Sequence, residues 1–100
     1  MNDLAETLRH LKAEMHERLT QLKTERDELR VRIHLAKAEV LQEWEKAEAT
    51  WAKFQARTEV LGKCAGDAGR DVGTAARLLG DEIQHAYRRI RDALSRYERP

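Results

Sequence analysis

The sequence predicts an all-α protein: a long antiparallel hairpin of two helices with coiled-coil-like packing, which forms oligomers. The stretch 4–61 contains no glycine and no proline, and apolar residues recur along it in steps of three and four. That spacing marks one face of an α-helix. Four of the five glycines then fall within 62–73, where a helix is expected to end. A second apolar stripe follows, so we expect helices over about 3–61 and 68–98 in a single domain.

The first predicted helix is unusually long for a chain of this size. Asp3, followed three residues later by Glu6, has the pattern of a capping box that opens a helix. The mean step of the apolar stripe is about 3.56 residues, between the coiled-coil and the free-helix period, which predicts slight supercoiling. Fully straight, this helix would measure about 88 Å.

The glycine-rich segment has two interpretations. We favour a turn near 62–68, with Gly62 or Gly66 in a left-handed conformation that closes the first helix. In the alternative, the helix continues, because small residues repeat every three or four positions and would allow another helix to approach closely. The members of this stripe are Gly62, Gly66, Gly69, Gly73, Ala76 and Gly80.

Folding the chain about residue 65 places one apolar stripe on the other over 30–98. Trp51 then faces Leu79, and Phe54 faces Ala76, so large side chains oppose smaller ones as interdigitated packing requires. The predicted hairpin core consists of Ile33, Val40, Trp44, Trp51, Phe54, Ala76, Leu79, Ile83, Ala86, Ile90 and Leu94.

The hairpin leaves the N-terminal half of the first helix, 1–29, without a partner in the chain. A bare apolar stripe associates in water, so we expect a homo-oligomer, most simply a dimer. An antiparallel dimer centred on Met15 is favoured, because a parallel one would bury Arg26 against its copy. Apolar residues on several faces of 31–41 leave a tetramer open. The predicted interface comprises Leu4, Leu8, Leu11, Met15, Leu19, Leu22, Arg26 and Leu29.

Composition restricts the function classes. Charged residues make up 37% of the chain, and 19 basic residues nearly cancel 18 acidic ones, so no overall field attracts nucleic acid or anionic lipid. No apolar run has the length of a membrane span, and the N-terminus lacks the apolar core of a signal peptide. The single Cys64 excludes an intrachain disulfide. We therefore expect a cytoplasmic protein.

No catalytic, cofactor-binding or metal-binding residues are predicted. The histidines show no pairing at helical spacing and no zinc motif; they are His10, His16, His34 and His85. Cys64 is interpreted as a small residue of the turn, and a redox role for it stays open. We therefore expect no cofactor and no enzymatic activity.

Arginines gather near the C-terminus, in the run Tyr87–Arg91 and at Arg96 and Arg99. A basic cluster with an aromatic residue is one pattern of phosphate binding. We favour a simpler interpretation, in which these arginines complement the negative end of the helix dipole.

Three segments carry a resemblance to known proteins: the run Glu28–Glu39, the stretch around Trp44 and the helix Val72–Leu94. Together they resemble small, uncharacterised helical coiled-coil proteins of proteobacteria, and this resemblance implies no activity. In composition, the charged amphipathic helices are also similar to granule-coating phasins.

The sequence thus favours a non-enzymatic coiled-coil protein that self-associates and scaffolds another protein. One alternative is an amphipathic protein that opens its hairpin and binds a lipid or granule surface. A second alternative is weak nucleic-acid binding through the C-terminal arginines.

Overall fold

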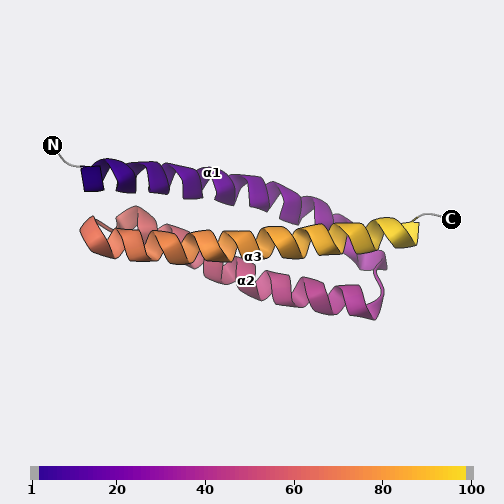
Figure 1. The fold of residues 1–100 in the computed structure, drawn as a ribbon. Helices are drawn as coiled ribbons and strands as arrows, with labels where there is room; N and C mark the ends of the chain where they lie inside the picture. Colours follow the sequence, from indigo (N-terminus) through magenta and orange to yellow (C-terminus); the bar gives the residue numbers. More distant parts are fainter. Residues whose placement is uncertain (1–2, 99–100) are drawn as a thin grey trace.

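The computed structural model describes residues 3–98, which form three helices packed side by side (Figure 1). Helix α1 spans Asp3–Arg32, α2 spans Ala38–Lys63 and α3 spans Gly66–Glu98, and a short 3₁₀ helix, η1, spans Ile33–Leu35. Helices α1 and α3 run in the same direction and α2 runs against both. The all-α prediction is confirmed, but the expected hairpin of two helices is a bundle of three.

The predicted helix 3–61 is wrong, because the chain bends between α1 and α2. After η1, the Ala36 N–H donates to the Ile33 carbonyl at 3.1 Å. Ala36 (φ −78°, ψ 152°) and Lys37 (φ −70°, ψ 159°) are extended. The Lys37 carbonyl then accepts hydrogen bonds from the N–H groups of Val40 and Leu41 in the first turn of α2, both at 3.0 Å. Both extended residues keep a negative φ, so the bend requires neither glycine nor proline.

The bend forms because it allows the chain to bury its own apolar stripe. Leu8, Met15, Leu22 and Leu29 are at most 8% exposed, and burying each such side chain contributes about 1.5–3 kcal/mol. Interrupting the helix frees a few backbone groups, each of which loses only about 0.5–1.5 kcal/mol because water replaces the partner. Burial outweighs the interruption, and the molecule measures 60 × 19 × 16 Å instead of forming a long rod.

The predicted turn between the last two helices is confirmed. Helix α2 ends at Lys63, Cys64 donates its N–H to the Leu61 carbonyl at 3.1 Å, and Gly66 has a φ of +66°. The alternative of a continuous helix through the glycines is therefore wrong. The turn is also tighter than 62–68, since only Cys64 and Ala65 lie outside the helices.

The pairing of α2 with α3 lies close to the predicted fold about residue 65. Trp44 stacks on Tyr87, with ring centroids 6.1 Å apart, and Arg89 lies 3.8 Å from the Glu43 carboxylate. In each pair, the midpoint of the two residue numbers lies within about one residue of position 65. Alternating large and small residues on two antiparallel helices therefore predict their register.

The core is shared by all three helices. It contains every residue of the predicted hairpin core except Leu79, which is half-buried against it. It also contains four residues of the predicted oligomer interface, while Leu4, Leu11, Leu19 and Arg26 are half-buried. The buried hydrophobic residues are Leu8, Met15, Leu22, Leu29, Ile33, Val40, Trp44, Ala47, Trp51, Phe54, Leu61, Ala76, Ile83, Ala86, Tyr87, Ile90 and Leu94.

Helix α1 approaches α3 closely along the glycine stripe. A Cβ atom at Gly73 would overlap Leu11 Cδ2, and one at Gly69 would lie 2.6 Å from Leu8 Cδ1. At Gly80, a Cβ atom would meet Arg18 Nε at 3.1 Å and Phe54 Cε1 at 3.2 Å. The part of the small-residue stripe formed by Gly69, Gly73 and Gly80 therefore receives the side chains of α1.

A glycine substitution on this stripe tests the packing of α1 on α3. Gly73→Ala, in the interior of α3, gains about 0.5–1 kcal/mol of helix propensity. Gly62→Ala, one residue before the end of α2, gains no more than this, but a Cβ atom at Gly62 meets nothing within 4 Å. We expect Gly62→Ala to stabilise the protein and Gly73→Ala to be less stable than Gly62→Ala by about 1–3 kcal/mol. Denaturant unfolding measures both.

The matched check is Leu11→Ala, which removes the atoms that a Cβ atom at position 73 would meet. The cost of Gly73→Ala should largely vanish in that background. Equal stability of Gly73→Ala and Gly62→Ala would contradict the close approach of α1.

Candidate interaction surfaces

Three ion-paired contacts flank the packing of α1 on α3. Arg77 donates two hydrogen bonds to Glu14, at 3.1 and 3.2 Å, and Arg18 donates to Asp81 at 2.6 Å. Further along, Arg91 donates to Glu25 at 2.6 Å. These partners are 63 to 66 residues apart in the chain, so they repeat with nearly constant offset between two parallel helices. Partly exposed pairs contribute little stability each, but together they define the register of α1.

Arg26, the one charge on the apolar stripe of α1, has its partners within the chain. Its guanidinium donates to both carboxylate oxygens of Glu48, at 2.7 and 2.8 Å, and lies 5.5 Å from the centre of the Trp51 ring. The hydrogen bonds that Arg26 donates to Glu48 raise the pKa of Arg26 above its ordinary value. The two hydrogen bonds to Glu48 and the face of the Trp51 ring together compensate the charge of Arg26 where α1 meets α2.

Tyr87 is a core residue that the sequence pattern assigned to the basic cluster instead. Its side chain is fully enclosed, and its hydroxyl makes no hydrogen bond to the residues that the structure describes. Burial raises the pKa of Tyr87, the nearby Glu48 raises it further, and Arg26 opposes the shift. The phenol is therefore held neutral. In the sequence, Tyr87 directly follows Ala86 of the second apolar stripe, and this neighbouring position indicates a wider apolar face on α3.

Among the residues whose burial the structure describes, the most exposed large apolar side chains lie at the bend. Val31 is 74% exposed and Leu35 is 96% exposed, and we name these two residues the bend patch. Leu41, at 37% exposed, lies one turn into the next helix. The sequence shows 31–41 as apolar on several faces, and the structure covers only the face that carries Ile33 and Val40.

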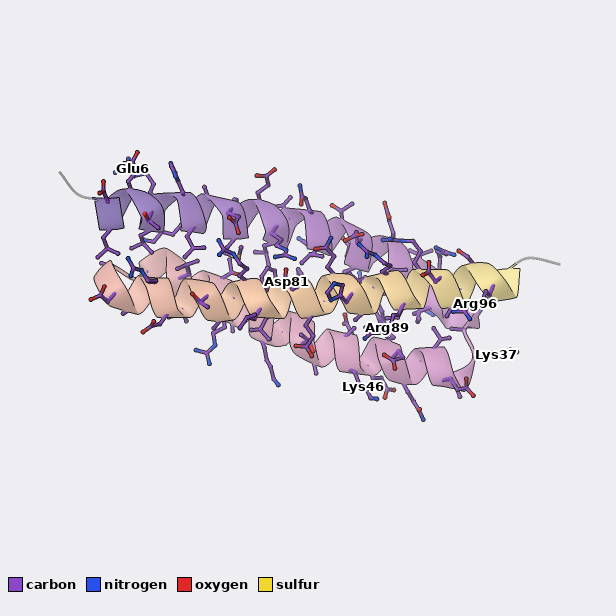
Figure 2. The ribbon with its side chains drawn as sticks, viewed as in Figure 1. Glu6, Lys37, Lys46, Asp81, Arg89 and Arg96 are labelled. Atoms are coloured by element: carbon purple, nitrogen blue, oxygen red, sulfur yellow. The ribbon has the colours of Figure 1, made fainter. Side chains whose placement is uncertain are left out.

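A groove runs between α2 and α3 at the same end of the bundle. Its floor is apolar and its rim carries both charges, a composition suited to a partner that combines an apolar contact with polar edges. Figure 2 shows Lys37 and Arg96 at this end, beside the bend. The groove is lined by Glu39, Val40, Gln42, Glu43, Arg89, Ile90, Ala93 and Arg96.

The residues considered for chemistry are scattered. All four histidines are exposed, and within residues 3–98 no three His, Cys, Asp or Glu side chains are grouped closely enough to hold a metal ion. Cys64 is half-buried in the turn, and its carbonyl accepts a hydrogen bond from Lys12 Nζ at 2.8 Å. This hydrogen bond connects α1 to the turn between α2 and α3.

The C-terminal arginines point to different sides of α3. Arg91 pairs with Glu25 of α1, whereas Arg89 lies beside Glu43 of α2. Arg88 and Arg96 are exposed. Arg99 lies outside the described residues. Between 87 and 96 the arginines therefore do not share one face.

Comparisons of the chain with protein-family models, with curated proteins and with solved structures found no match. Among the described residues, no helix combines the length and apolar composition needed to cross a membrane.

The raised pKa of Tyr87 predicts that the protein loses stability at alkaline pH. Because the unfolded chain ionises near the ordinary pKa of 10.0 and the folded chain ionises at higher pH, the stabilising contribution is complete below pH 10 and is lost as pH rises above it. Between about pH 10 and 11, the unfolding free energy should fall more steeply than in Tyr87→Phe, by up to about 1.4 kcal/mol per pH unit.

Denaturant unfolding of both proteins at several pH values measures this difference. At pH 7 the two should agree within about 1 kcal/mol, because the hydroxyl makes no hydrogen bond to a described residue. Parallel stability curves above pH 10 would show that the phenol ionises freely in the folded protein.

Proposed function

We propose that this protein is a non-enzymatic assembly module that self-associates and holds another protein against its surface. The observation that carries the proposal is the bend patch of Val31 and Leu35, which lies at the same end of the bundle as a groove of mixed charge (Figure 1). Large apolar side chains with a polar rim, presented on rigid helices, are typical of protein contact surfaces.

The interior supports binding over catalysis. At its edge, where α1 meets α2, Arg26 pairs with Glu48, and burial keeps the neighbouring Tyr87 neutral. Each of these groups stabilises the packing of three helices. A catalytic site instead needs convergent groups that are open to a substrate.

Self-association has to use other contacts than the side-by-side dimer expected from the sequence. That dimer required a bare stripe on α1, but Met15, its predicted centre, is fully buried within one chain. Two copies therefore associate either through outer surfaces or after α1 has left its own bundle.

A lipid-surface function is the second candidate, and the bend is the feature that favours it. If the bundle opened at Ala36 and Lys37, α1 would expose an amphipathic face suited to an interface. The net charge of +1 offers little attraction to anionic lipid. A gain of sedimentation with vesicles of anionic phospholipid would support this candidate over the assembly module.

Self-association predicts a mass that depends on concentration, because dimer formation is linked to the amount of protein. Sedimentation equilibrium between about 1 µM and 1 mM should show the weight-average mass rising from 11.6 kDa toward twice that value. A constant monomer mass across this range would contradict self-association.

The bend patch predicts which surface holds a heterologous partner. In pull-downs from the host, Val31→Ser/Leu35→Ser should lose proteins that the wild type retains, because the apolar contact is removed. The matched control is Leu78→Ser, which changes a residue 64% exposed on α3 and should retain them. Identical capture by all three proteins would show that the patch is not the contact.

A further inference from the structure

We propose that two chains associate by exchanging α1. In this dimer the bend straightens, α2 stays on its own α3, and each α1 packs on α2 and α3 of the second copy. The inference rests on the self-association proposed above and names its mechanism. Exchange of an identical element between copies is a low-cost route to a dimer, because the contacts already exist in the monomer.

The backbone of the bend is suited to straightening. Ala36 and Lys37 have φ values of −78° and −70°, which are close to those of a helix, so chiefly their ψ angles have to change. The sequence Leu35-Ala-Lys-Ala38 consists of good helix formers. No residue in the described chain except Gly66 has a positive φ, so no left-handed residue at the bend enforces the interruption.

The apolar stripe also continues through the bend without a change of phase. Leu29, Ile33, Ala36 and Val40 follow one another in steps of four, three and four, and in the monomer all four are buried or half-buried. In a straight helix over 3–63, the α1 face and the α2 face would therefore lie on the same side. One half can cover its own α3 while the other half covers the α3 of a second copy.

The register within the monomer fits a two-fold dimer. Along the sequence, residue 37 is the midpoint between Arg26 and Glu48, and it lies at the bend itself. Two straightened helices that pair antiparallel about an axis at residue 37 therefore bring Arg26 of one copy to Glu48 of the other. The contacts of α1 with α3, such as Arg18–Asp81, are remade in the same way. The interface is self-complementary, as a closed two-fold dimer requires.

Two opposing contributions to the free energy of association make the exchange dependent on protein concentration. Straightening adds helical hydrogen bonds at both bends, whereas association removes the translational freedom of one chain. In the observed pairing of α2 with α3, Leu94 lies opposite residue 37. In the dimer, the last turn of α3 therefore meets the same turn of the other copy at the two-fold axis, and it has to move aside. Interconversion is slow, because α1 has to expose its buried leucines before it finds a second copy.

A disulfide between α1 and α3 distinguishes the two arrangements. Leu11 Cγ lies 2.8 Å from the position of a Cβ atom at Gly73, so cysteines at these two positions fall within disulfide reach. The variant Leu11→Cys/Gly73→Cys/Cys64→Ser is refolded at about 1 µM and at about 1 mM. Its monomer and dimer fractions are separated by gel filtration and oxidised.

The expected result is a covalent dimer from the dimer fraction and a covalent monomer from the monomer fraction, on a denaturing gel without reductant. If the dimer fraction yields only covalent monomers, the chains associate without exchange; this overturns the inference and leaves self-association intact. If no dimer fraction forms at either concentration, both the inference and self-association are overturned.

A second variant tests the bend without new cysteines. Ala38 is the first residue of α2, a position that accepts proline, and the extended Lys37 before it suits a following proline. In a straight helix the same proline removes a hydrogen bond and clashes. Ala38→Pro should weaken dimerisation roughly 10⁴-fold, about a hundredfold for each of two helices.

The matched control, Ala38→Ser, permits both forms and should dimerise within about tenfold of the wild type. Circular dichroism verifies that Ala38→Pro keeps the helix content of the monomer. Unchanged dimerisation of Ala38→Pro would overturn the exchange.

Discussion

The packing of α1 into the glycine stripe of α3 is the contact on which the rest of the structure depends. Leu8 and Leu11 occupy space that a Cβ atom at Gly69 or Gly73 would fill, so the two helices approach more closely than ordinary side chains permit. This approach buries the apolar stripe of α1 and makes a bend favourable between α1 and α2. The Lys12 bond to the Cys64 carbonyl and the ion pairs along α3 follow from the same placement.

Arg26 adds specificity to packing that is otherwise apolar. A charge on a buried stripe is costly unless it is paired, and the bidentate bond to Glu48 at 2.7 and 2.8 Å is available in one register of α1 on α2. A shift by one helical turn would leave both groups without each other. Glu48 also contributes to the raised pKa of Tyr87, so the same pair affects all three helices.

The bend connects the fold to the proposed function. It presents Val31 and Leu35 to solvent, and it is the one place where the path from α1 to α2 leaves the helical conformation. In the proposed exchange, an α1 that packs on another copy makes contacts equivalent to those of an α1 that packs on its own chain. On that proposal, concentration decides between the closed bundle and the assembly.

The sequence by itself determined the helical class, a turn within 62–68 and the pairing of α2 with α3. These follow from local spacing and from glycine's access to positive φ. It did not reveal the bend, because Ala36 and Lys37 carry no local signal against a helix, and the apolar stripe continues through them. Only the tertiary structure decided that α1 turns back, that Arg26 meets Glu48 and that Tyr87 is enclosed. The reason is that burial of α1 on the glycine stripe, a contact between segments about 60 residues apart, outweighs the few backbone hydrogen bonds lost at the bend.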